Sequence, residues 1–168
     1  AEALAGFLHY GLPRKWTRYH VSRENLRRAF GENVSEAWID RTVYRMWLHL
    51  FRTVVEIVQA PRKLHRQTYH NVCDFVDLAY TNDALLAGRR LLVLGGHFGN
   101  WEVANALFGV WGFPMGVIAR EMDNPLLDQW FRQYREGYGH RLLLKKGDYD
   151  DMLNLLRAGG SVALLCDQ

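Results

Sequence analysis

The sequence predicts an α/β fold in which N-terminal helices precede alternating strands and helices around a largely parallel sheet. Two observations indicate this class. In the first part of the chain, apolar residues recur at i, i+3, i+4 and i+7, which is the period of an amphipathic helix. From residue 88 onward, short apolar runs alternate with helical segments across short connections, as in the strand–helix units of parallel sheets.

Two helices are expected at the N-terminus. Residues 14–30 carry six Lys or Arg among aromatic and apolar side chains. A longer helix is expected to begin after Ser35, a favourable N-cap, and to end at Pro61, which cannot continue a helix regularly. Its apolar stripe runs from Val43 to Val58, and we expect that stripe to face a core.

The second part of the chain predicts four strands, at residues 91–94, 115–119, 142–144 and 162–165. Helices are expected between them. One spans residues 101–111, one begins at Asn124-Pro125, and one runs from an Asp148 cap to the Gly159-Gly160 pair. Ligands of parallel sheets gather beyond the carboxyl ends of the strands, where His97, Arg120 and Asp167 are expected.

Composition and charge limit the classes of function that the chain can have. The chain has 168 residues, 49% of them apolar, and two cysteines, which excludes intrinsic disorder, collagen and a disulfide scaffold. Residues 1–66 hold 12 Lys or Arg against 6 Asp or Glu, whereas residues 67–168 hold 9 against 12. We therefore expect a basic helical N-terminal region, 1–66, and an α/β core, 67–168. The basic region favours an anionic partner: nucleic acid, acidic lipid or an acidic carrier protein.

One motif in the sequence has the side chains that acid–base catalysis requires. The predicted strand that ends near Leu94 runs into Gly95-Gly96-His97, and Glu102 follows at the expected start of a helix. A carboxylate bonded to one imidazole nitrogen fixes the tautomer, so the other nitrogen can take a proton from a hydroxyl. Neither Ser nor Cys lies nearby in the sequence as an obvious nucleophile. This favours direct transfer of a group to the substrate hydroxyl, without a covalent intermediate on the protein. Taken alone, the pair fits a structural histidine equally well.

The string Gly-His-Phe-Gly-Asn-Trp-Glu, residues 96–102, resembles the bacterial lipid A biosynthesis acyltransferases, within the superfamily marked by His-x4-Asp/Glu. Further segments resemble the same family in the same order: Asn25 to Phe30, Arg120 with Asp123 to Leu126, Arg135 with Gly137, Lys145 to Gly147, and Gly159 to Gln168. The family continues beyond its Asp-Gln step. We therefore expect this chain to be an incomplete domain, truncated at its C-terminus.

The resemblance implies transfer of a fatty acyl group from acyl carrier protein or acyl-CoA to a hydroxyl of a lipid A precursor or related glycolipid. It implies attachment to the cytoplasmic face of the bacterial inner membrane, and a reaction that needs no metal or cofactor. His97 would be the general base and Glu102 its orienting carboxylate. The substrate-binding residues would be Asn100, Arg120, Arg135, Lys146 and Asp167.

Two other readings remain open. The second hypothesis is a non-catalytic lipid- or glycolipid-binding module. A lysophosphatidate-type acyltransferase fits less well, because that branch usually has Asn and Asp where this chain has Gly96 and Glu102. Nucleic-acid binding is not expected, since the basic segment carries no nucleic-acid fold signature. His65, His70 and Cys73 do not follow a recognised zinc spacing, so no metal site is expected.

Overall fold

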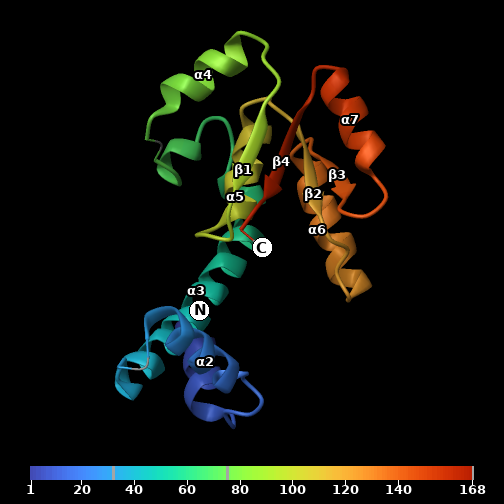
Figure 1. Cartoon of the computed structure of the whole chain (residues 1–168). Helices are drawn as coiled ribbons and strands as arrows, with labels where there is room; N and C mark the ends of the chain where they lie inside the picture. Colours follow the sequence, from blue (N-terminus) through green and yellow to red (C-terminus); the bar gives the residue numbers. More distant parts are fainter. Residues whose placement is uncertain (32, 75, 168) are drawn as a thin grey trace. The chain divides into compact units, whose positions relative to one another are not determined.

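The computed structural model describes residues 1–31, 33–74 and 76–167 (Figure 1). It divides into two compact units, Ala1–Gln59 and Ala60–Gln168. The division falls within one long helix, α3 (Glu36–Lys63). Each unit is described by itself.

The first unit is helical. Helix α1 (Glu2–Gly6) runs into a π-helical turn (Phe7–Gly11), and α2 (Tyr19–Phe30) and the greater part of α3 follow. Its core is built on Tyr19, Ile39 and Val43, which are almost fully buried, and Trp47 packs against them. The predicted apolar stripe of α3 therefore supplies this core at Val43 and Trp47, and Ile39 adds to it from one turn before the stripe. Farther along α3, by contrast, Val54 and Val58 are exposed.

The two N-terminal helices differ from expectation at one end each. Helix α2 begins at Tyr19 rather than near residue 14, because Arg18 has a left-handed backbone conformation, with a φ of 53°, that no α-helix accommodates. Helix α3 begins as predicted, and the Ser35 hydroxyl accepts the N–H of Trp38 at 3.2 Å. It does not end at Pro61. The N–H of Leu64 reaches the carbonyl of Ala60 at 2.7 Å, so the last turn passes through the proline.

The second unit holds a four-stranded, all-parallel sheet, and this confirms the predicted α/β class. Its strands are β1 (Leu92–Gly95), β2 (Met115–Ala119), β3 (Arg141–Leu144) and β4 (Ser161–Leu165), in the order β1-β4-β2-β3. Helices α5 (Trp101–Val110), α6 (Pro125–Gly137) and α7 (Tyr149–Arg157) connect them. A 3-10 turn (Tyr69–Asn71) and α4 (Leu78–Leu86) precede the sheet.

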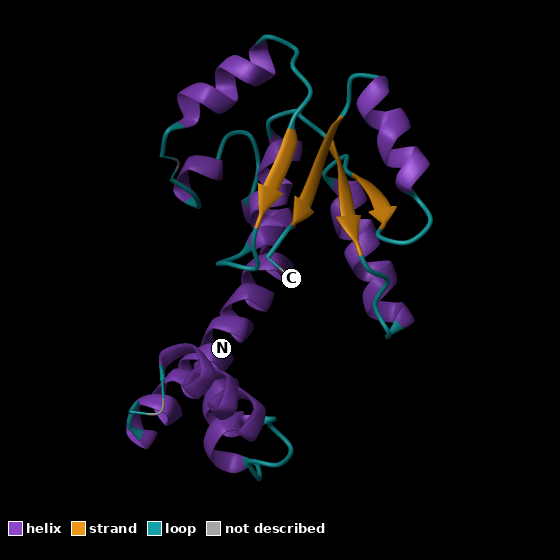
Figure 2. Cartoon of the chain, in the orientation of Figure 1, coloured by secondary structure: helices purple, strands orange, loops and turns teal. Residues whose placement is uncertain are grey.

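The strand order sets the layers. The connections from β1 to β2 and from β2 to β3 cross the sheet in one direction, and the connection from β3 to β4 crosses back. Since such crossovers are right-handed, α5 and α6 cover one face and α7 the other. Figure 2 shows α5 and α6 behind the strands. Gly116 permits the contact with α7, because a Cβ there would lie 2.6 Å from Leu155 Cδ2.

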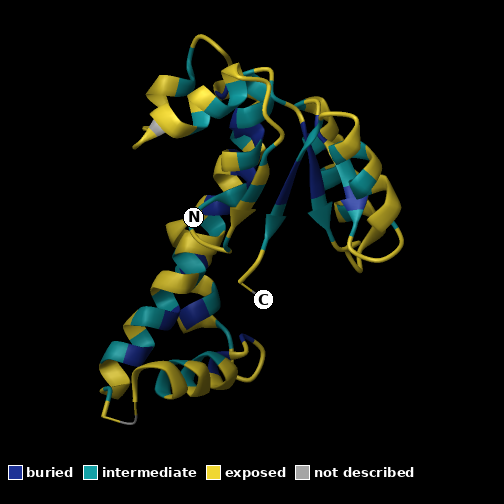
Figure 3. Cartoon of the chain, turned by 45° about the horizontal axis from the view of Figure 1, so that its top comes forward, coloured by how far each residue is buried: buried dark blue, intermediate teal, exposed yellow. Residues whose placement is uncertain are grey.

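The core of this unit follows the two central strands. Val117 of β2 and both Val162 and Ala163 of β4 are buried, and Figure 3 shows the dark, buried segments along these strands. The buried imidazole of His140 joins two layers, since its Nδ1 accepts the N–H of Met115 and its Nε2 donates to the carbonyl of Asn105. Within the described parts of both units, no helix combines the length and apolar character needed to span a membrane.

Candidate active site

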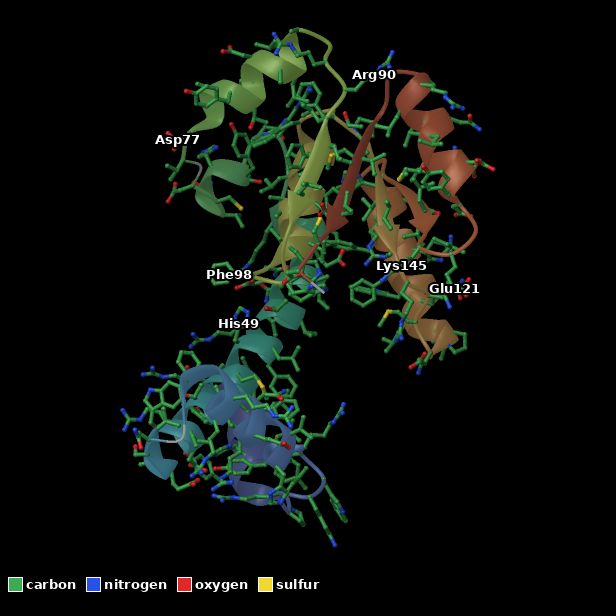
Figure 4. All side chains as sticks on the ribbon, viewed as in Figure 1. His49, Asp77, Arg90, Phe98, Glu121 and Lys145 are labelled. Atoms are coloured by element: carbon green, nitrogen blue, oxygen red, sulfur yellow. The ribbon has the colours of Figure 1, made fainter. Side chains whose placement is uncertain are left out.

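The carboxyl ends of the four parallel strands carry the polar residues that the sequence singles out. His97 follows β1, Arg120 follows β2 directly, and Asp167 follows β4. Figure 4 shows Phe98, Glu121 and Lys145 at this edge of the sheet, with Arg90 at the opposite edge. The residues of the motif therefore lie where ligands of parallel sheets bind.

A cavity of about 1210 Å³ opens at this edge. His97, Glu102, Arg120 and Arg135 line it together with many apolar side chains, which include Phe98, Trp101, Phe108, Val117, Met122, Phe131, Leu143 and Met152. An apolar wall with a few charged groups is the usual composition of a site for a small molecule or an extended apolar chain.

The imidazole of His97 is held by Asp167. Its Nδ1 lies 2.7 Å from one carboxylate oxygen of Asp167, and its backbone N–H donates to the other oxygen, also at 2.7 Å. The ring of Trp101 packs edge-on against the imidazole, with 5.0 Å between the ring centroids. The hydrogen bond from the His97 side chain, followed by the one from its backbone, lowers the pKa of Asp167. At neutral pH the carboxylate is therefore ionised.

The ionisation state of Asp167 determines the tautomer of His97. An ionised carboxylate only accepts hydrogen bonds, so the proton of a neutral imidazole lies on Nδ1. The lone pair of Nε2 is then the basic site of the ring. This arrangement has the chemical capacity of a general base that removes a proton from a bound hydroxyl.

Glu102 lies elsewhere in the site. Its side chain is 6% exposed and accepts two hydrogen bonds from Arg135, from Nε at 3.1 Å and from Nη2 at 2.6 Å. Among the described residues, no hydrogen bond or ion pair joins Glu102 to His97. The reason is its place in the first turn of α5, on the side that packs against α6, whereas His97 lies beside β4.

The remaining expected binding residues take different positions. The side chain of Asn100 accepts the N–H of Val103 and so caps α5. Arg120 lines the cavity with a largely exposed guanidinium, 3.8 Å from Asp123. Lys146 is exposed, and it is its neighbour Lys145 that lines the cavity. Because β3 ends at Leu144, Lys145 is the first residue beyond the strand. This position would have favoured Lys145 over Lys146 as a residue of the cavity.

Two further observations complete the site. Cys166, the residue that follows β4 directly, lines the cavity, and this position at the end of a strand would have indicated it. In the described residues, no three His, Cys, Asp or Glu side chains gather as a metal site would require.

Comparison with known proteins assigns the chain to a family. A search among curated proteins gives no match. A family model described as bacterial lipid A biosynthesis acyltransferase matches residues 4–168, nearly the whole chain. With the His97 motif at the carboxyl edge of a parallel sheet, this match establishes that the chain belongs to the bacterial lipid A biosynthesis acyltransferase family.

Proposed function

We propose that the protein moves a fatty acyl group from acyl carrier protein or acyl-CoA to a hydroxyl of a lipid A precursor or a related glycolipid. The proposed location is the cytoplasmic face of the bacterial inner membrane. The observation that carries the proposal is His97, whose imidazole lines a largely apolar cavity and whose Nδ1 is held by a carboxylate. Family membership supports the acyl-transfer class.

In the proposed reaction, Nε2 of His97 takes the proton of the acceptor hydroxyl while the oxygen attacks the thioester carbonyl carbon. A carbon–oxygen bond forms and the carbonyl oxygen becomes an oxyanion. The oxyanion then reforms the carbonyl as the carbon–sulfur bond breaks, and the leaving thiolate takes the proton back from Nε2. The products are an ester and a free thiol, and His97 returns to its neutral form.

The cavity accounts for both substrates in this proposal. Its apolar wall, with Phe108, Phe131 and Met152, suits an acyl chain. Arg120 is mostly exposed at the cavity, and its guanidinium would bind a phosphate of the acceptor in two-point fashion. Lys146 is exposed near the end of β3 and would add a positive charge for the same headgroup. Arg135 is paired with Glu102, so we assign it to the cavity wall.

The experiment measures transfer of a radiolabelled acyl group from acyl carrier protein, and separately from acyl-CoA, to lipid A precursors and related glycolipids. His97→Ala should reduce kcat by about 10²–10⁴-fold, the usual contribution of a general base. The matched control is His49→Ala, because His49 is an exposed histidine on α3, in the other unit. This control should transfer at the wild-type rate.

The possible outcomes distinguish the proposed function from the two alternatives, a lipid-binding module and a lysophosphatidate-type acyltransferase. Transfer by His97→Ala at the rate of His49→Ala contradicts the assigned base. Tight binding of acceptor lipid without any transfer by the wild-type chain supports a lipid-binding module instead. Transfer to lysophosphatidate in preference to every glycolipid supports the lysophosphatidate-type alternative.

A further inference from the structure

We infer that the cavity holds two apolar subsites, one on each face of the sheet, and that the subsite beneath α7 binds an alkyl chain of the acceptor lipid. The inference rests on the proposed function, because it gives separate places to the chain of the donor and the chain of the acceptor. The size of the cavity supports two ligands. Pockets that enclose one small ligand measure about 300–1,000 Å³, and this cavity, at about 1210 Å³, exceeds that range.

The register of the sheet places apolar lining residues on two opposite faces. A Cβ at Gly116 would lie 2.6 Å from a side chain of α7, so this position of β2 faces α7. Successive side chains of a strand alternate between the faces, and paired residues of neighbouring strands share a face. Ile118 of β2 and Leu164 of β4 therefore face α7, whereas Val117 and Ala163 face α5 and α6. All four of these apolar residues line the cavity.

The part of the cavity beneath α7, which we call the α7 lobe, is lined by Ile118, Leu164, Tyr149 and Met152. Ile118, Leu164 and Met152 are half-buried, so a ligand has access to their apolar side chains. Leu94 of β1 lies opposite Leu164 in the sheet and is 62% exposed on the same face. The floor of the α7 lobe thus extends over three adjacent strands, about 10 Å of apolar surface.

The other part of the cavity, the α5/α6 lobe, holds the reacting group. Trp101, Phe108 and Phe131 line it, and the ring of Trp101 packs against the imidazole of His97. In the proposed reaction the carbonyl carbon of the donor lies at His97, so the chain attached to that carbon enters the α5/α6 lobe. The α7 lobe is then the apolar surface that a chain of the acceptor can occupy.

Positive charge lies at the strand ends, next to the α7 lobe. Arg120 directly follows β2 and Lys145 directly follows β3, and both line the cavity. His97 follows β1, and β4 lies between β1 and β2, so the two strand ends are about 10 Å apart. An acceptor whose phosphate binds Arg120 and Lys145 can place one chain in the α7 lobe while its hydroxyl reaches His97. Cations beside an apolar floor predict an amphipathic anion as the ligand.

The test uses decyl phosphate, an amphipathic anion, below the concentration at which it forms micelles. The full 168-residue chain has four methionines, so ¹³C labelling of their methyl groups gives four NMR signals. Met152 should shift and saturate, whereas Met46 of α3, which is 42% exposed in the other unit, should not shift. Arg120→Gln should weaken the affinity for decyl phosphate about tenfold. Arg90→Gln is the matched control at the opposite edge of the sheet and should bind as the wild type does (Figure 4).

Two variants decide which lobe binds the alkyl chain. Met152→Glu places a charge in the α7 lobe and should weaken decyl phosphate at least about tenfold in calorimetry. Phe131→Leu, in the α5/α6 lobe, is its control and should change that affinity by less than about threefold. The backbone amide spectrum verifies that each variant folds. Tyr149→Glu, at a 66% exposed position of the α7 lobe, replaces Met152→Glu if that variant is unfolded, with the same expected loss.

The inference is overturned if decyl phosphate leaves Met152 unshifted, shifts Met46 as strongly, or loses equal affinity in Met152→Glu and Phe131→Leu. In the transfer assay, Met152→Glu should raise the KM for the acceptor about tenfold and leave the KM for the donor within about threefold. Equal increases in both KM values would also contradict two separate subsites. Absence of any transfer by the wild type would contradict the proposed function and leave the decyl phosphate titrations as the test of the α7 lobe.

Discussion

The carboxylate of Glu102 and the guanidinium of Arg135 form a two-point ion pair between α5 and α6, and both side chains are largely buried. The pair joins residues 33 positions apart and lies in the wall of the cavity. It ties together the two helices that cover the same face of the sheet. A buried pair of this kind matters most when one partner is removed, since the other charge then has no partner.

Arg135→Ala should lower the free energy of unfolding by about 3 kcal/mol, because it leaves the Glu102 carboxylate buried and unpaired. The double variant Glu102→Gln/Arg135→Met should recover much of that loss, since it removes both charges. Urea unfolding followed by circular dichroism measures both values. Arg132→Ala is the control on the same helix, because its 3.7 Å pair with Asp128 is more exposed and should contribute at most about 1 kcal/mol. An equal loss of unfolding free energy in Arg132→Ala and Arg135→Ala would show that the buried pair contributes no more to stability than the exposed pair.

Gly109→Ala tests the packing of α5 against the end of α6. A Cβ at position 109 would overlap the carbonyl oxygen of Tyr138, which is backbone and cannot turn away. We expect a loss of about 2 kcal/mol or more in unfolding free energy, measured by urea titration. Gly137→Ala is the control, since no atom lies within 4 Å of its added Cβ, and it should change stability by less than about 1 kcal/mol. Similar effects of the two substitutions would contradict the close approach of these segments.

His140 should make the stability of the protein depend on pH. Burial lowers the pKa of His140, and its Nδ1 must stay unprotonated to accept the N–H of Met115. The unfolded chain therefore takes up this proton at higher pH than the folded chain, so the unfolding free energy should fall as the pH drops below about 6.5.

Urea unfolding between pH 8 and pH 5 measures this dependence. His140→Asn should lose part of it, although the variant is less stable at every pH. His65→Ala, at an exposed position of the same unit, should keep the wild-type dependence. A slope in His140→Asn as steep as that of the wild type would show that another group is responsible.

Local sequence patterns predicted the local structure well. The strand at 115–119 has the expected bounds, and the side chain of Asn124 accepts the N–H groups of Leu126 and Leu127, as the predicted cap requires. Asp148 begins its helix as expected, but its side chain accepts the N–H of Leu144 and makes no cap bond. The Asp148 carboxylate could accept either the N–H of Leu144 or an N–H in the first turn of the helix. The geometry of the turn after β3 decides between them, and helix propensities do not specify that geometry.

The pairings of the site could not be predicted in the same way. Each carboxylate has a partner that is distant in sequence, Asp167 with His97 and Glu102 with Arg135. These pairings depend on β4 lying beside β1 and on α5 lying beside α6, and no local pattern encodes the order of strands in a sheet. The spacing of His97 and Glu102 therefore identified two residues of the cavity, while the partner of each followed from the topology.

The pH dependence of kcat/KM for acyl transfer tests most directly whether neutral His97 is the base. The same protein gives, by NMR, the pH at which the His97 imidazole takes up its second proton. The proposed mechanism predicts that kcat/KM falls to half its plateau at that pH and that His97→Ala shows no such step. A half-maximal pH that differs from the NMR value by a full unit, or an unchanged step in His97→Ala, would contradict it.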